Sequence, residues 1–380
     1  MIYLHWEPDG RYSMSSIGIE WKKRFTITPE NPPNDGLIFA DMQKQNRSSH
    51  LGHALVEYAP GCILGLYPNC DSSNYGHNGN GWMEYRRSTD GGETWSEPIP
   101  LPYSKQLYDD DVGRTAMCEK AILTNDGKII LFLLICDMQT NGTYWTPLWE
   151  PLITCSADGG QTFDEPRRLC GKRGRVFDVI YRNGRIYVLF NNSGALINNN
   201  AEVSSYQIYV SDDNGKSFGL LTNVLFPNTK YCYYGTMEFL PDDRLIIYIY
   251  DENDEYNLKY ITCSAEGTDW DNPRRAYFAR KIRNPQLVCY SGEYFLHGRS
   301  GLDNRSESSG HFILYHSIDG INWDNGIYLR MREAGFGAYS NNLLVGARFP
   351  GKKQRLLIQS SHAYSDHMTN TLMWWLDKIQ

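Results

Sequence analysis

The sequence has no excess of positive charge, no run of Lys and Arg, and no apolar stretch of membrane-spanning length. Its 44 acidic and 37 basic residues give a formal net charge of -7. A nucleic-acid surface needs a basic patch, and a membrane-spanning helix needs about 20 mostly apolar residues. We therefore expect neither a nucleic-acid partner nor insertion into a membrane.

The nine cysteines include no Cys-X-X-Cys pair. An odd number of scattered cysteines favours buried thiols in a reducing compartment over a disulfide framework or a zinc site, and we predict no cofactor. The N-terminus has no charged segment followed by an apolar run. We expect a cytoplasmic protein, or a secreted one if a signal peptide has been removed.

One short pattern recurs five times at spacings that settle near fifty residues, as expected for propeller blades. An aspartate in such a pattern can accept backbone hydrogen bonds, and the glycine after it can take the positive φ that closes a hairpin. The final aromatic residue then packs beneath the turn. The copies are Ser88-Thr-Asp-Gly-Gly-Glu-Thr-Trp95, Ser156-Ala-Asp-Gly-Gly-Gln-Thr-Phe163, Ser211-Asp-Asp-Asn-Gly-Lys-Ser-Phe218, Ser264-Ala-Glu-Gly-Thr-Asp-Trp270 and Ser317-Ile-Asp-Gly-Ile-Asn-Trp323.

Between the repeats, a two-strand pattern rich in β-branched and aromatic residues opens six times. Six openings with five repeats predict an all-β protein, a six-bladed β-propeller that takes up residues 1–380 as one domain. The segment 1–45 is predicted to complete or cover the last blade. The openings begin near residues 50, 113, 174, 234, 283 and 337.

The repeats resemble the Asp box, or BNR repeat, of the sialidase superfamily, whose fold is a six-bladed β-propeller. In that family the boxes lie on the face away from the active site. The resemblance implies a divergent member that binds a carbohydrate. It also implies a retaining glycoside hydrolase that uses a tyrosine nucleophile on a terminal acidic sugar.

In a propeller the first strand of each blade lines the central channel, and its leading residues surround the mouth where ligands bind. Several arginines at one mouth imply either internal carboxylate partners or an anionic ligand. The predicted substrate-binding residues are Arg114, Arg175, Asp178, Arg283, Arg299, His50, His53, His77 and Tyr234.

The segment Phe336-Gly-Ala-Tyr-Ser-Asn342 resembles the Ala-Tyr-Ser segment that carries the sialidase nucleophile, which implies this role for Tyr339. A neutral phenol is not repelled by the carboxylate of an acidic sugar, but its pKa near 10 requires a nearby base. Asp71 lies in the loop where sialidases place their acid/base residue. Glu238, Asp178 and the Asp109-Asp-Asp111 cluster are further candidate acids or bases.

The sequence departs from the sialidase pattern at three places. Leu51-Gly-His53 stands where the family has its first arginine, in an Arg-Ile-Pro. The glutamate that pairs with the nucleophile would fall near Tyr234, and another arginine near Tyr250. Either Arg283 or Arg299 matches the fifth-blade arginine of the family's triad.

Two other functions remain open. His50, His53 and His77 flank the first-blade loop, and histidine, tyrosine and arginine together suit β-elimination from a uronic acid. Some propeller polysaccharide lyases resemble this arrangement; metal binding by the three histidines lacks a tight spacing signature. The missing glutamate and arginines also fit a glycan-binding propeller without catalysis. The oligomeric state is not predicted.

Overall fold

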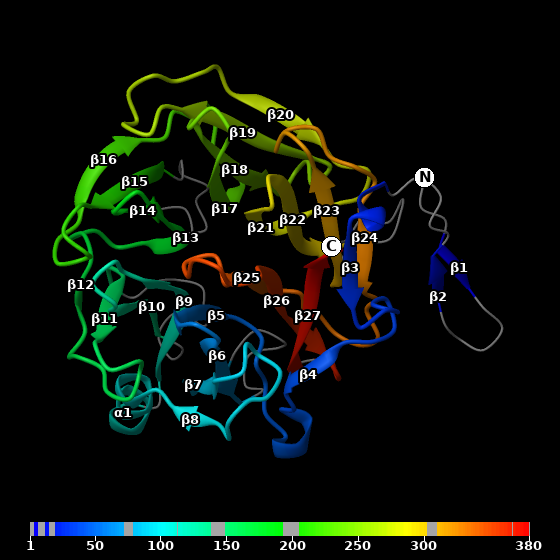
Figure 1. The fold of residues 1–380 in the computed structure, drawn as a ribbon. Helices are drawn as coiled ribbons and strands as arrows, with labels where there is room; N and C mark the ends of the chain where they lie inside the picture. The colour runs from blue at the N-terminus through cyan, green and yellow to red at the C-terminus, as the bar shows by residue number, and fades with distance from the viewer. Residues whose placement is uncertain are drawn as a thin grey trace.

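The computed structural model describes residues 4–6, 12–14, 20–71, 79–111, 113–137, 149–192, 205–301, 310–366 and 368–379. Six antiparallel sheets stand around a central axis as the blades of a propeller (Figure 1). The prediction of an all-β, six-bladed β-propeller is confirmed. Among the described residues α1 (Pro102–Asp110) is the single α-helix, and no helix there is long and apolar enough to cross a lipid bilayer.

The first three blades each run outward from the channel in chain order. Blade 1 contains β5 (Ala54–Ala59), β6 (Cys62–Cys70), β7 (Gly81–Ser88) and β8 (Ile99–Pro100); blade 2 contains β9 (Arg114–Leu123), β10 (Ile129–Asp137), β11 (Leu152–Ser156) and β12 (Arg167–Arg168); blade 3 contains β13 (Arg175–Arg182), β14 (Arg185–Asn192), β15 (Ser205–Ser211) and β16 (Gly219–Asn223).

The remaining blades follow the same order, except that the last one takes strands from both ends of the chain. Blade 4 contains β17 (Cys232–Phe239), β18 (Leu245–Asp251), β19 (Asn257–Cys263) and β20 (Arg274–Tyr277); blade 5 contains β21 (Arg283–Tyr290), β22 (Glu293–Ser300), β23 (His311–Ser317) and β24 (Ile327–Arg330); blade 6 contains β25 (Ser340–Val345), β26 (Arg355–Ala363), β27 (Thr369–Lys378), β3 (Phe25–Thr28) and β4 (Leu37–Ala40).

The N-terminal strand β3 pairs antiparallel with β27, so that the two ends of the chain share blade 6 (Figure 1). Phe25 anchors this strand, because its buried ring packs edge-on against Tyr290 and Phe295 of the neighbouring blade 5. Strand β4 also pairs with β27. Two short 3₁₀ helices, η1 (Glu20–Lys23) and η2 (Gln43–Gln45), adjoin these strands, and β1 (Leu4–Trp6) pairs with β2 (Tyr12–Met14).

The inner strands β5, β9, β13, β17, β21 and β25 contact one another in a closed ring. Each enters its blade at one face of the molecule, which we call the mouth face, and ends at the other. The repeated turns follow the third strand of blades 1 to 5, and β7 ends beside the start of β6, where β5 also ends. The turns therefore lie on the face opposite the mouth, here called the turn face.

The turn after β7 is closed by its own side chains. The Ser88 hydroxyl donates to Asp90 Oδ1 at 2.7 Å and accepts from the Gly92 N–H at 2.8 Å, while the Thr94 N–H donates to Asp90 at 3.0 Å. Hydrogen bonds from the Thr94 hydroxyl and N–H and from Ser88 lower the pKa of Asp90 to about 2. Matching bonds close the turns that begin at Ser156, Ser211 and Ser317.

A glycine in each turn lies against the preceding blade. Gly160 of blade 2 abuts Leu64 of blade 1, and Gly215 of blade 3 abuts Ile130 of blade 2. Both have positive φ, 78° in each case. The turns thus form part of the seams between blades, where a side chain on the glycine has no space.

We expect Gly215→Ala to lower the free energy of unfolding by about 3 kcal/mol, because the methyl group adds an overlap with Ile130 Cδ1 to the left-handed strain. Gly127→Ala is the matched control: its φ is 79°, but nothing lies within 4 Å of the added methyl group. It should cost only about 1 kcal/mol. Urea unfolding of both variants measures the difference, and equal losses would contradict a packing role for Gly215.

Candidate functional site

Tyr339 lies at the mouth, directly before β25, with 9% of its surface exposed. Ser361 of β26 fixes its backbone: the Ser361 hydroxyl accepts from the Tyr339 N–H at 3.2 Å, and the Ser361 N–H donates to the Tyr339 carbonyl at 2.9 Å. The ring is 4.8 Å from that of His50, edge to face, and 6.0 Å from that of Tyr234. Blades 1, 4 and 6 therefore meet at this tyrosine.

Arg299 covers the Tyr339 ring, with its guanidinium carbon 5.7 Å from the ring centre. Only 7% of Arg299 is exposed. Its Nε has no hydrogen-bond partner among the described residues, and no carboxylate there forms an ion pair with it. Arg299 is therefore a nearly buried cation at the mouth that forms no ion pair with a described carboxylate, and its nearest acidic influence is Glu255, which is already paired with Arg283.

The other predicted arginines of the mouth have acidic partners. Arg175, 1% exposed, forms an ion pair with Glu119 and lies 4.8 Å from the centre of the Tyr234 ring. Burial disfavours the charge of Arg175, but Glu119 more than offsets this and raises the pKa of Arg175. Burial also raises the pKa of Tyr234 well above 10, although Arg175 opposes the shift.

Arg283 of β21 is the cross-strand neighbour of Arg299 on β22. It pairs with Glu252 at 3.1 Å and Glu255 at 3.0 Å, and it donates to the Tyr250 hydroxyl at 3.2 Å. At the edge of the mouth, half-buried Arg114 pairs with Asp111 at 3.2 Å and lies over the Trp149 ring. These two arginines form ion pairs with described carboxylates, whereas Arg299 forms none.

Asp71 follows β6 directly and lies at the mouth face, because β6 ends where β5 begins. Its carboxylate accepts a hydrogen bond from the Asn80 N–H at 2.9 Å. Two of the three predicted histidines belong to the described residues. His50 and His53 are buried, and burial lowers the pKa of His53 to about 4, whereas His77 lies outside the described residues.

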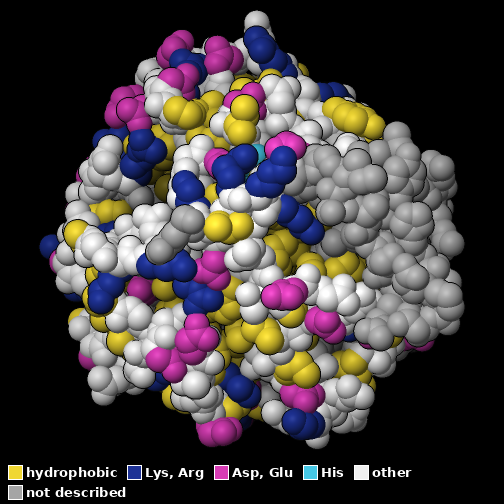
Figure 2. Space-filling model, turned by 45° about the vertical axis from the view of Figure 1, so that its right-hand side comes forward, with side chains coloured by type: hydrophobic (Ala, Val, Ile, Leu, Met, Phe, Trp, Pro, Cys, Tyr) yellow, Lys and Arg dark blue, Asp and Glu magenta, His cyan; other side chains and the backbone are white. Residues whose placement is uncertain are grey.

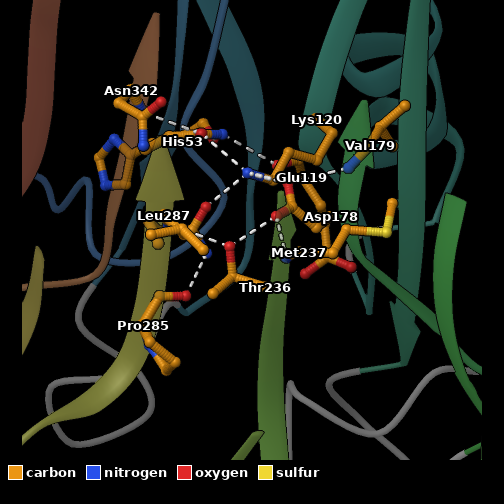
Figure 3. Close-up of polar contacts among 12 residues, drawn as sticks. His53, Glu119, Lys120, Asp178, Val179, Thr236, Met237, Pro285, Leu287 and Asn342 are labelled. Carbon is orange, nitrogen blue, oxygen red and sulfur yellow. Dashed lines mark hydrogen bonds and ion pairs between the residues drawn. The ribbon is translucent and has the colours of Figure 1, made fainter. Parts of the chain in front are cut away.

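Asp178 lies deeper, in a polar cluster that crosses the channel (Figure 3). It pairs with Lys120 at 3.0 Å and accepts hydrogen bonds from the Thr236 hydroxyl at 2.6 Å and the Met237 N–H at 2.9 Å. The Lys120 ammonium also donates to Gln286, and to Asn341 at 3.0 Å. The Asn341 amide donates to the carbonyl of His53, so all six blades contribute to this cluster.

We call Lys120, Asp178, Thr236, Gln286 and Asn341 the channel plug. A cavity of about 40 Å³ lies on its mouth side, and one of about 240 Å³ lies on its turn side. Lys120 and Asn341 line both cavities. The plug therefore separates two compartments of one channel.

Glu238 lies on the turn side of the plug, whereas Tyr339 lines the mouth-side cavity. Its carboxylate accepts hydrogen bonds from the Phe239 N–H at 2.8 Å and the Cys289 N–H at 3.1 Å. Burial raises the pKa of Glu238 to about 7. The structure thus does not bring this predicted acid together with the predicted nucleophile. Glu238 lies near the end of β17, far from the mouth-face end of that strand.

The chain was compared with protein families, curated proteins and solved structures. No family model and no curated protein matches the chain. The Hadza microbial sialidase Hz136 is 14% identical with a TM-score of 0.65, over 90% of this chain and 68% of that chain. The chain has the fold of a sialidase propeller.

Other solved propellers share this fold. A protein of unknown function from Dyadobacter fermentans DSM 18053 is 14% identical with a TM-score of 0.66, over 91% of this chain and 98% of that chain. An α-L-arabinanase from Penicillium chrysogenum, complexed with arabinobiose, is 12% identical with a TM-score of 0.54, over 90% and 97%. At these identities the likeness shows the fold alone.

Sequence reasoning missed Glu119, Lys120, Gln286 and Asn341 as parts of the channel. Glu119 and Lys120 are adjacent charges between apolar residues of β9, a signal visible in the sequence. On the face shown in Figure 2, the described basic and acidic side chains are interspersed. Within the described ranges no three His, Cys, Asp or Glu side chains lie close enough to hold a metal ion.

Proposed function

We propose that the protein is a glycoside hydrolase that cleaves a terminal acidic sugar from a glycan at the mouth, with Tyr339 as nucleophile. The observation that carries the proposal is the contact between Arg299 and Tyr339. A nearly buried guanidinium without an ion pair of its own is costly, and a ligand carboxylate would offset that cost. The same ligand would then lie beside the phenol of Tyr339.

The proposed mechanism is retaining. The Tyr339 hydroxyl oxygen attacks the anomeric carbon and gives its proton to Glu119, while the glycosidic C–O bond breaks and Asp71 protonates the departing oxygen. Water then attacks the same carbon and gives its proton to Asp71. The Tyr339 oxygen leaves and regains its proton from Glu119. Among the described residues, Glu119 is the one carboxylate that lines the mouth-side cavity with Tyr339.

A second candidate function is β-elimination from a uronic acid, favoured by the contact between the His50 and Tyr339 rings. Here one of the two rings removes the proton α to the sugar carboxylate, a C=C bond forms as the glycosidic C–O bond breaks, and the other ring protonates the departing oxygen. Arg299 would stabilise the carboxylate as its charge increases. This reaction consumes no water.

The products formed from sialylated and uronic-acid oligosaccharides separate these functions. Release of a free, saturated acidic sugar supports hydrolysis, whereas ultraviolet absorbance from an unsaturated uronate supports elimination. Saturable binding without product formation supports a glycan-binding propeller. If acidic oligosaccharides neither bind nor react, the proposed function is wrong.

Replacing Arg299 tests the anion contact. We expect Arg299→Met to raise KM about 10- to 100-fold for an acidic substrate, because one charge-assisted contact is worth about 1.5–3 kcal/mol. The amide of the same sugar should be affected far less. Arg244→Met is a control on the turn face, where Arg244 pairs with Asp269. Equal effects of Arg299→Met on acid and amide would contradict the assignment.

A further inference from the structure

The turn-side cavity is a separate compartment. Its volume is about 240 Å³, and the channel plug closes it off from the mouth. Its wall combines polar side chains with aliphatic residues, which include Leu55, Val179, Ile180, Met237, Leu287 and Leu343. At about 30 Å³ per water molecule, this volume holds about eight water-sized groups. The proposed hydrolase has no use for such a space.

Arg348 lies at the turn-face end of this cavity. It follows β25 in blade 6, and its guanidinium donates to the Leu123 carbonyl at 2.8 Å and to Asn125 Oδ1 at 3.0 Å, both of blade 2. These acceptors are neutral, and no described carboxylate forms an ion pair with Arg348. Burial lowers the pKa of Arg348. The cavity therefore has an anchored cation at one end without a described counter-charge.

Tyr181 adds a second polar group at the same end. The Arg348 guanidinium lies 4.1 Å from the centre of the Tyr181 ring. The Tyr181 hydroxyl is buried and donates to no described residue, although its oxygen interacts with the Arg348 guanidinium and opposes the effect of burial on the pKa of Arg348. Buried hydroxyl groups are generally hydrogen-bonded, so this donor indicates a missing acceptor.

The remaining acids of the cavity are already engaged. Asp178 is paired with Lys120, and Glu238 accepts two backbone hydrogen bonds. Glu57 accepts from the Gly61 N–H at 2.8 Å and the Gly346 N–H at 2.6 Å. Among the described residues that line the cavity, the Arg348 and Tyr181 end combines a cation without an ion pair and a buried hydroxyl that donates to no acceptor.

We propose that the turn-side cavity binds a small aliphatic monocarboxylate. Its carboxylate would accept hydrogen bonds from Arg348 and the Tyr181 hydroxyl, and its hydrocarbon chain would extend along the aliphatic wall toward the plug. Two contributions would stabilise the bound ligand: charge-assisted hydrogen bonds to its carboxylate and burial of its apolar hydrocarbon chain. This site is independent of the sugar chemistry proposed for the mouth.

Calorimetric titration of the full chain with butanoate, hexanoate and octanoate tests the proposal. We expect saturable binding that tightens about fourfold for each added methylene until the cavity is full. Octanol, which lacks the charge, should bind at least tenfold more weakly than octanoate. Binding at the mouth is distinguished by repeating the titration with the acidic oligosaccharide present, which should leave octanoate affinity unchanged.

Two variants and a control locate the site. Arg348→Met retains an apolar stem and should weaken octanoate binding at least tenfold, and Ala121→Leu should weaken it by filling the cavity. Arg182→Met is the control, because Arg182 pairs with Asp243 on the same face and does not line the cavity. Thermal unfolding checks that each variant is folded. Absence of saturable binding, equal binding of octanol, or insensitivity to both variants would overturn the proposal.

Discussion

Tyr339→Phe is expected to lower kcat for an acidic glycan by about 10³-fold or more, since loss of a nucleophile removes the whole covalent route. The ring contacts with His50, Tyr234 and Arg299 remain possible for phenylalanine, so substrate affinity and stability should change little. The measurement is kcat and KM with the acidic oligosaccharide. Tyr277→Phe is the control, because Tyr277 is 66% exposed on the outer strand of blade 4.

The partner of the nucleophile is tested in the same assay. Glu119→Gln should lower kcat by about 10²-fold and flatten the acidic limb of the pH profile, because a proton acceptor must be deprotonated to act. If Glu119 had only a structural role, the substitution would reduce stability through the lost ion pair with Arg175 but would leave the shape of the pH profile unchanged. Full activity of Tyr339→Phe would exclude the proposed nucleophile, and an unaltered profile in Glu119→Gln would exclude the proposed base.

The repeats made the fold predictable, because a hydrogen-bonded turn of fixed length recurs once per blade and needs only local residues. The six inner strands and the mouth positions of Tyr339 and Arg175 followed from the same period. Which charges neutralise one another was not predictable. Arg175 meets Glu119 of the preceding blade, and that contact depends on how blades 2 and 3 pack, not on any spacing in the sequence.

Depth along a strand was the other feature that the sequence did not reveal. Asp178 lies three residues after the start of β13 at Arg175, and there it enters the plug. Glu238 lies six residues after the start of β17 at Cys232, and it is therefore on the turn side of the plug. Bulges in both strands alter which residues point inward. The roles predicted for these two carboxylates remain predictions.

Breaking the plug should give the largest loss of stability. Lys120→Met removes the counter-charge of Asp178 and should lower the free energy of unfolding by about 3–5 kcal/mol. Asp178→Leu should cost a similar amount, because it leaves the Lys120 ammonium with amide acceptors alone and the Met237 N–H without its acceptor. Denaturant unfolding of both variants measures these losses, and losses below about 1 kcal/mol would contradict them.

The double variant Lys120→Met with Asp178→Leu decides what the plug is for. If Lys120 and Asp178 mainly compensate each other's buried charge, the double variant should be more stable than either single variant, since no uncompensated charge remains. Thr236 and Asn341 would still face the channel, and the Thr236 hydroxyl would still accept from the Leu287 N–H of blade 5. A double variant with additive losses would instead show that the charges hold the six blades together through their separate contacts. In that case octanoate and sugar binding should weaken together, because the partition between the two compartments is lost.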